Sequence, residues 1–237
     1  MRRVLSRTGV DVTEASSRRA CLVVAPHPDD ETLGAGATIM RKIRAGTPVH
    51  LAVVTDGSKS PSGDPAQVTA LRSAELAAAC DVLGLSPRHV TRLPFVDAEL
   101  AGEGEALTEA IAGVVGAVRP VEVLVTAEND PHEDHALVGA ATRRALAGSG
   151  IRLLTYPIWQ FDRPMRLWQQ WRGGRPELVR TDGYRERKRR AVGAYRSQMA
   201  ARNDDPEGLR PNFLPNFDRP YELFFPVAVP ARDDRRR

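Results

Sequence analysis

Two short acidic segments hold three of the five histidines of the chain: HPDDE at 27–31 and NDPHEDH at 129–135. Two imidazoles and one carboxylate form a ligand set suited to catalytic zinc, which keeps three protein ligands and leaves one position for water. Zinc in such a site lowers the pKa of water toward about 7, and a second carboxylate beside it can accept the proton. The two segments together predict a metal-dependent hydrolase.

Each segment alone also fits a purely structural role. Asp29, Asp30 and Thr32 can cap the following helix by accepting its free backbone N–H groups. Capping does not require His27, however, and His27 lies three residues before Asp30, just as His132 lies three residues before His135. Residues at this spacing point the same way in a helical turn. The pair of segments therefore favours metal binding, with Glu31 expected to be structural.

Both segments follow apolar runs in an alternating pattern of strands and helices. Strands are predicted at 20–26, 49–57, 89–95, 121–127 and 151–159, and helices at 31–46, 67–84, 103–117, 136–147 and 184–201. Parallel neighbours need crossover connections, so this pattern predicts an α/β, Rossmann-like fold: a mostly parallel sheet in a single domain, with helices on both faces. Ligands bind beyond the carboxyl ends of the strands in such a sheet, where both segments lie.

The remainder of the chain has a weaker pattern. Residues 160–183 and 203–220 are irregular and rich in glycine and proline, and they are expected to form loops around the site. Together with residues 58–66, these loops are expected to shape the choice of substrate. Residues 221–229 are predicted to form a late strand, placed at the edge of the sheet because of Pro226.

Length and hydropathy favour one domain without a membrane span. The 237 residues divide into an N-terminal extension at 1–19, a domain at 20–230 and a basic tail at 231–237. No apolar stretch approaches the roughly 20 residues that a bilayer requires. The arginines near the start are not followed by the apolar region of a secretory signal, so a cytoplasmic location is expected.

The charge balance gives little support for a nucleic-acid partner. The net charge is +4, but the basic residues are scattered and aromatic residues make up only 5%. The dense clusters at 185–190 and 232–237 are expected to be a solvated helix face and a frayed tail. Cys21 and Cys80 are expected to be buried free thiols.

The motifs resemble those of the PIG-L or LmbE-like de-N-acetylases, whose signature is a strand followed by HPDDE and a later H-x-D-H turn. The matching segments here are APHPDDETLG at 25–34 and PHEDH at 131–135. The resemblance extends through TDG at 55–57, the R-x-x-E of Arg72 and Glu75, and Asp97. It covers roughly residues 20–140.

The resemblance implies a role for each matching residue. The implied ligands of one zinc per chain, or of another divalent metal, are His27, Asp30 and His135. The implied acid–base groups are Asp29 as general base and His132 as general acid or oxyanion stabiliser, supported by Asp134. The implied substrate-pocket residues are Arg72, meeting hydroxyls or a phosphate, and Asp97, meeting a sugar hydroxyl. An exposed Arg72–Glu75 helical pair and a turn beginning at Asp97 are the structural alternatives.

The implied reaction removes an acetyl group from an N-acetylglucosamine-type conjugate and releases acetate and an amine. An amidase acting on a thiol–sugar conjugate is the alternative within the family. The same ligand set occurs in mononuclear iron oxygenases, but the spare carboxylate of Asp29 favours hydrolysis. Nucleotide binding through GAG at 34–36 lacks the third glycine of the fingerprint, which Ile39 replaces. The non-enzymatic alternative is a basic binding protein that contains a metal.

Overall fold

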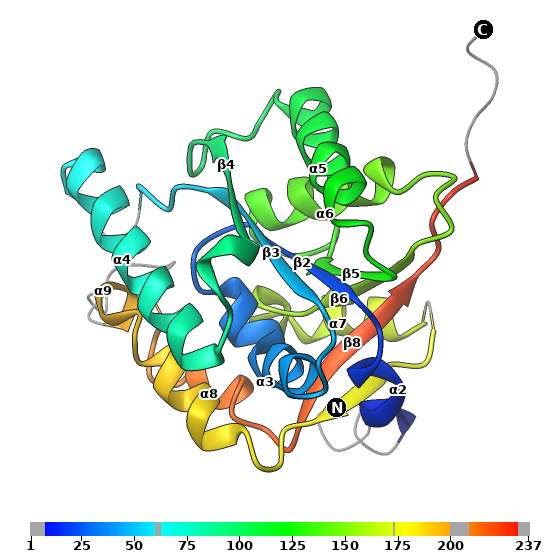
Figure 1. Cartoon of the computed structure of the whole chain (residues 1–237). Coiled ribbons are helices and arrows are strands. Elements are labelled where there is room, and N and C mark those ends of the chain that lie inside the picture. The colour runs from blue at the N-terminus through cyan, green and yellow to red at the C-terminus, as the bar shows by residue number, and fades with distance from the viewer. Residues whose placement is uncertain (1–7, 60–62, 173, 200–208, 232–237) are drawn as a thin grey trace, which may run out of the picture.

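The computed structural model describes residues 8–59, 63–172, 174–199 and 209–231. Within these residues, eight strands form one sheet in the order β1-β7-β8-β6-β5-β2-β3-β4 (Figure 1). Every neighbouring pair is parallel except the two pairs that include β8. The predicted α/β class with a mostly parallel sheet is confirmed.

Five strands carry the Rossmann-like part of the sheet, and each lies inside its predicted range. They are β2 (Cys21–Ala25), β3 (Val49–Thr55), β4 (Val90–Phe95), β5 (Glu122–Thr126) and β6 (Arg152–Tyr156). Their spatial order is β6-β5-β2-β3-β4, so the first of them lies in the middle. The direction of winding changes between β2 and β5, which is the position where such sheets bind ligands.

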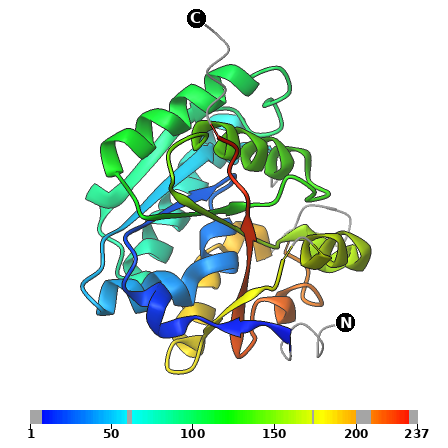
Figure 2. The ribbon, with the colours of Figure 1, turned by 90° about the vertical axis from the view of Figure 1, so that its right-hand side faces the viewer.

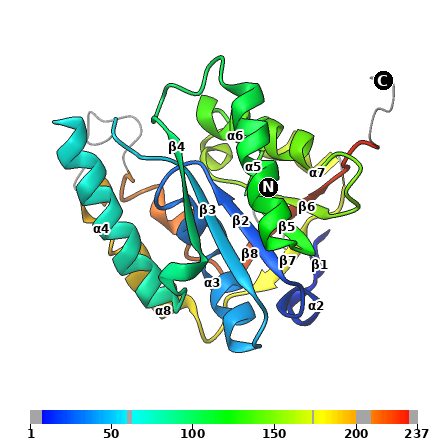
Figure 3. The same cartoon turned by 45° about the horizontal axis from the view of Figure 1, so that its top comes forward.

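Helices cover both faces of this sheet, as predicted (Figures 1 and 3). One face packs against α3 (Asp30–Arg44), α4 (Pro65–Leu83) and α8 (Arg185–Val192), and the other against α5 (Gly104–Val118) and α6 (Glu133–Ala145). Since helices lie on both sides, β2 and β5 are buried along their whole length, which explains the unbroken apolar sequence of β2 and the apolar centre of β5.

The strand β8 (Tyr221–Val227) lies inside the sheet, between β6 and β7, and the prediction that it forms an edge was wrong (Figure 2). Its residues 221–224 pair with β7, whereas 225–227 pair with β6. At Pro226 the strand therefore has only β6 as a paired neighbour. One side of the strand is open there, and this accommodates a residue without an N–H group.

The segment 160–183, expected to be irregular, contains regular structure. It includes α7 (Pro164–Arg172) and β7 (Glu177–Arg180), and β7 pairs with β8 on one side and with β1 (Val10–Asp11) on the other. The four residues of β7 are too few for an alternating pattern to be recognised in the sequence. The strand is defined by its pairing with strands that are distant in the sequence.

The predicted helix at 184–201 is divided into α8 and α9 (Arg196–Met199). Within the basic run of α8, the expectation of a solvated face holds except at Lys188, which is buried and pairs with Glu222. Cys21 and Cys80 are buried free thiols, as expected.

Other expectations concern parts of the chain that are only partly described. Residues 60–62 of the loop 58–66, residues 203–208 of the segment 203–220, and residues 232–237 of the basic tail lie outside the described residues. The expected division at residues 19 and 230 stays a prediction. Among the described helices, none has the length and apolar character to cross a membrane. The cytoplasmic location stays a prediction.

Candidate metal centre and active site

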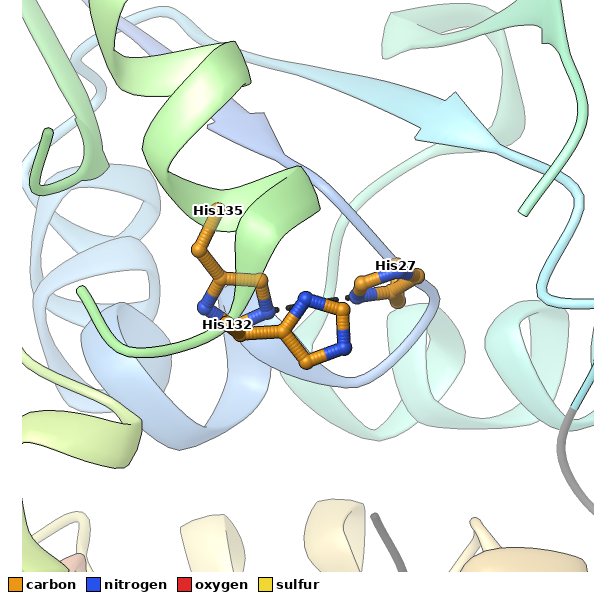
Figure 4. A group of neighbouring side chains, drawn as sticks. All are labelled: His27, His132 and His135. Atoms are coloured by element: carbon orange, nitrogen blue, oxygen red, sulfur yellow. Dashed lines mark hydrogen bonds between the residues drawn. The ribbon is translucent and has the colours of Figure 1, made fainter. Parts of the chain in front are cut away.

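The two acidic segments meet where the winding of the sheet changes direction. The first connects β2 to α3 and the second connects β5 to α6, and β2 and β5 are neighbours. A Cβ at Gly139 would lie 2.6 Å from the carbonyl oxygen of Thr126, so glycine lets α6 approach the end of β5 closely. Thr126 Oγ1 donates to the carbonyl of His135 at 2.9 Å. Figure 4 shows the side chains of His27, His132 and His135 converging there.

Three donor atoms of His27, Asp30 and His135 form a small triangle. His27 Nδ1 lies 3.2 Å from His135 Nε2 and 3.4 Å from Asp30 Oδ2, and His135 Nε2 lies 3.2 Å from Asp30 Oδ2. Ligands bonded at about 2.0–2.1 Å in a tetrahedral zinc site are about 3.3 Å apart. All three side chains are buried. The donor set and its spacing therefore fit a divalent cation.

Carboxylates lie behind both histidines of this triangle. His27 Nε2 is 3.0 Å from Asp97 Oδ1 and 3.3 Å from Asp134 Oδ2. His135 Nδ1 is 3.6 Å from Asp130 Oδ1. Outer carboxylates of this kind orient metal-binding histidines and increase their basicity. The arrangement behind the triangle is a second feature that fits a metal centre.

The charges around the triangle shift its pKa values. Burial lowers the pKa of His27, but hydrogen bonds with Asp134, Asp30 and Asp97 outweigh it and hold the pKa well above its usual value. His135 behaves in the same way: burial opposes the charged form, yet the carboxylates of Asp30 and Asp130 raise its pKa to about 9. The site therefore favours positive charge at its centre.

Asp29 lines the cavity and has no atom in the triangle. Its Oδ2 lies 3.4 Å from Nη2 of Arg72, and its backbone has φ 134°. Burial raises the pKa of Asp29 to about 8 against the opposing charge of Arg72, and the carboxylates of Asp30 and Glu31 add to the rise. A carboxylate in this position can exchange a proton with a molecule in the cavity.

His132 precedes α6 and presents its ring to the other two imidazoles. The ring centroids are 4.6 Å from His135 and 4.9 Å from His27. Burial lowers the pKa of His132, and the neighbouring charges of His135 and His27 add to this shift and bring the pKa to about 4. The ligand atoms of the three histidines all lie within 4.8 Å of one another. His132 therefore borders the same small volume as the triangle.

The structure places several predicted residues differently from the expectation. Asp134, expected to support His132, places Oδ2 beside His27 and accepts from the backbone N–H of Ala98 at 2.9 Å. Asp97, expected at a sugar hydroxyl, lies against His27. Asp97 also stands in a turn, since the backbone N–H of Glu99 donates to the carbonyl of Val96 at 3.2 Å, and its Oδ2 accepts from the Lys59 N–H at 3.1 Å.

Arg72 and Glu75 are both buried, so the alternative of an exposed helical pair was wrong. Arg72 lines the cavity and donates to the carbonyl of Pro28, next to Asp29. Glu75 accepts from the backbone N–H and the hydroxyl of Ser197, each at 2.7 Å.

Three residues at the site had no assigned role in the sequence prediction. Asp130 stands in the second acidic segment, one position after Asn129, and its place there could have indicated it. Trp159 and Gln198 line the cavity but belong to no motif. The cavity itself measures about 30 Å³, which is room for one or two waters or an ion.

Comparison with known proteins relates this site to amino-sugar deacetylases. A 1D-myo-inositol 2-acetamido-2-deoxy-alpha-D-glucopyranoside deacetylase of Kineococcus radiotolerans is 32% identical in an alignment that covers 62% of this chain and 54% of that protein. A probable N-acetyl-alpha-D-glucosaminyl L-malate deacetylase 2 of Bacillus cereus is 31% identical in an alignment that covers 54% of this chain and 61% of that protein. The chain thus spans about half the length of the curated relatives that it matches, or slightly more.

Solved structures show that the fold carries more than one reaction. A pseudoaglycone deacetylase of an antimicrobial reagent has a TM-score of 0.70 at 23% identity, covering 91% of this chain and 100% of that chain. The zinc-inhibited form of a teicoplanin deacetylase has a TM-score of 0.67 at 18% identity, covering 91% and 99%. The 4-carboxy-2-hydroxymuconate hydratase of Pseudomonas putida also has a TM-score of 0.67 at 18% identity, covering 90% and 97%. At these identities the likeness shows the fold alone.

The family itself is shown by the sequence. Residues 22–146, just over half of the 237, match the PIG-L family, described as GlcNAc-PI de-N-acetylase. Both acidic segments lie inside this match, at the positions where the structure brings them together. The chain therefore belongs to the PIG-L de-N-acetylase family.

Proposed function

We propose that the protein is a metal-dependent hydrolase that removes the acetyl group from an N-acetylglucosamine-type conjugate. The observation that carries this proposal is the triangle of His27 Nδ1, Asp30 Oδ2 and His135 Nε2, which has a spare carboxylate, Asp29, beside it. The names of the relatives, which include deacetylases of two different N-acetylglucosaminyl compounds, support the substrate class. Water adds to the acetyl carbon, the bond from carbon to nitrogen breaks, and acetate and an amine are released.

His27, Asp30 and His135 would hold the metal, for which zinc is the first candidate because of the two nitrogen donors and one oxygen donor. When bound, such an ion supplies Lewis-acid chemistry, polarising a carbonyl and making a water more acidic. A solved relative in fold is described as a zinc-inhibited form, so the amount of zinc added to an assay matters.

Asp29 would act as the general base. It is adjacent in sequence to Asp30 but turns its side chain toward Arg72, which leaves its carboxylate outside the triangle. Burial raises the pKa of Asp29, but a cation in the triangle would oppose this shift and favour the charged carboxylate. The carboxylate then accepts a proton from the attacking water and can return it to the departing nitrogen, so that one group takes part in both proton transfers. Proton transfers of this kind contribute about 10²- to 10⁴-fold each.

His132 would stabilise the carbonyl oxygen as negative charge develops on it. Burial keeps the pKa of His132 low, so the imidazole is neutral at pH 7 and offers an N–H donor. A cation in the triangle would move this pKa in the same direction. Of the two roles that the family resemblance implies for His132, the neutral ring favours the oxyanion stabiliser.

The test is acetate release from a panel of N-acetylglucosamine conjugates that includes a thiol conjugate with a second amide bond. The assay compares the protein loaded with one equivalent of zinc, the variant Asp29→Asn, and the control Asp81→Asn at an exposed position of α4. We expect the wild type and the control to release acetate. We expect Asp29→Asn to lose about 10²- to 10⁴-fold in rate while it retains its zinc.

Three other outcomes would contradict parts of this proposal. Cleavage of the second amide bond in place of acetate release would assign the amidase activity. Bound zinc without cleavage of any conjugate would assign the site to another reaction, as in the hydratase of the same fold. Failure of the wild type to bind a divalent metal would remove the basis of the proposal.

A further inference from the structure

The backbone of Asp29 adopts a conformation that residues with a Cβ rarely hold. Its φ and ψ are 134° and −30°. Such conformations are strained and persist only where neighbouring groups impose them. Asp29 lies between His27 and Asp30, so its conformation determines how the spare carboxylate lies relative to the triangle.

A buried carboxylate in the first turn of α3 holds this peptide. Glu31 Oε2 accepts from the backbone N–H of Asp29 at 3.1 Å. Glu31 Oε1 accepts from Thr32 Oγ1 and from the hydroxyl of Tyr195, each at 2.5 Å. Both oxygens of Glu31 are thus engaged, one by the strained peptide and the other by two hydroxyls.

Tyr195 comes from a distant part of the chain. It stands in the bend between α8 and α9 and, like Glu31, it is fully buried. Its ring packs in the apolar cluster that includes buried residues of α3, and its hydroxyl reaches Glu31 from there. The packing of α8 and the following bend against α3 therefore sets the position of Tyr195 relative to Glu31.

A carboxylate is an expensive group to bury, and an apolar side chain of the same size would fill this space at lower cost. What the carboxylate adds is an acceptor for the N–H of Asp29. We propose that Glu31 and Tyr195 form a positioning pair that holds Asp29 in the conformation required of the base. This inference rests on the proposed function, because it assigns Asp29 that role.

The test compares Tyr195→Phe with Tyr156→Phe. Tyr156 is an equally buried tyrosine whose hydroxyl donates to the carbonyl of Val24 at 2.9 Å, so its variant also loses one buried hydrogen bond but leaves Glu31 untouched. Two quantities are measured on the zinc-loaded proteins: kcat and KM for acetate release, and hydrogen exchange of the Asp29 amide. Metal content is measured in parallel.

We expect Tyr195→Phe to lower kcat by about tenfold to a hundredfold with KM and zinc content unchanged, because the base is misplaced while the ligands are not. Exchange of the Asp29 amide should become faster. Tyr156→Phe should leave both quantities near the wild-type values. If Tyr195→Phe does not fold, Thr32→Val removes the other donor to the same oxygen and should change kcat and exchange in the same direction.

If Tyr195→Phe and Tyr156→Phe have the same kcat and the same rate of hydrogen exchange at the Asp29 amide, Glu31 and Tyr195 do not act as a positioning pair. This result differs from failure of the proposed function, in which the wild type itself releases no acetate. The exchange measurement does not depend on activity. It therefore tests whether Glu31 and Tyr195 keep the Asp29 amide in place, whether or not the wild type releases acetate.

Discussion

The two ring nitrogens of His27 face different surroundings. Nδ1 points to Asp30 and His135, whereas Nε2 points to the carboxylates of Asp97 and Asp134. When Nε2 donates to a carboxylate, the neutral ring must carry its lone pair on Nδ1. The outer carboxylates therefore select the tautomer that can bind a cation from inside the triangle.

Asp97→Asn tests this role. An amide can still accept from His27, but its lost charge makes the imidazole less basic, so we expect metal affinity to fall by about 10- to 100-fold. Competition with a chromogenic chelator measures the affinity, and Asp81→Asn serves as the exposed control. Unchanged metal affinity with a raised KM would instead support the sugar contact that the sequence suggests for Asp97.

At the residue scale, the proposed ligands are easier to anticipate from the sequence than the residues behind them. The two acidic segments follow adjacent strands, and the family resemblance selects His27, Asp30 and His135 from these segments. The contact of Asp97 with His27 depends on where a third strand ends and on one side-chain rotamer. Neither of these is encoded in local spacing.

At the scale of elements, the buried ion pair of Lys188 and Glu222 contacts the backbone of α3 near the middle of the helix. Glu222 of β8 accepts from the backbone N–H groups of Ala37 and Thr38 at 2.7 and 2.8 Å. Lys188 of α8 donates to the same carboxylate and to the carbonyl of Leu33, each at 2.7 Å. These hydrogen bonds connect α3, which begins with Asp30, to α8 and β8.

Lys188→Met should destabilise the protein strongly, because it leaves the Glu222 carboxylate buried without its cation. We expect a loss of about 3–5 kcal/mol in the free energy of unfolding, measured by denaturation in urea. The matched control is Lys59→Met, which removes the exposed ion pair with Glu99 and should leave the free energy of unfolding nearly unchanged. Similar losses in the two variants would contradict this account of Lys188.

The elements themselves were predicted to different degrees. Long strands and helices with clear periodicity appear where the sequence places them. The local pattern does not distinguish Lys188 from the exposed residues of the basic run at 185–190, because its partner Glu222 stands 34 residues later. Likewise, β7 is defined by its pairing with β8. Tertiary partners of this kind are outside the reach of local patterns.

Across the whole molecule, the triangle joins the two helical layers. His27 and Asp30 belong to the connection into α3 on one face, whereas His135 belongs to α6 on the other. A cation held by all three would link the layers and would bind the folded chain in preference to the unfolded chain.

Zinc should therefore raise the melting temperature. At a free concentration of 100 times Kd the folded state gains about 2.7 kcal/mol, which corresponds to roughly 5–10 °C for a chain of this size. Thermal denaturation with zinc and with a chelator measures the shift. His135→Ala should abolish it, whereas His50→Ala, at a histidine outside the site, should retain it. A shift that survives in His135→Ala would place the metal elsewhere.

The interior position of β8 has a consequence for synthesis on the ribosome. The strand β1 joins the sheet through β7, and β7 joins β6 only through β8, which follows all three in the sequence. Among the described strands, β1 is translated first, but its partner β7 is anchored to β6 only after β8 has been translated. Until then β6 presents an open edge, which gives nascent chains an interval in which a chaperone or a neighbouring chain could occupy it.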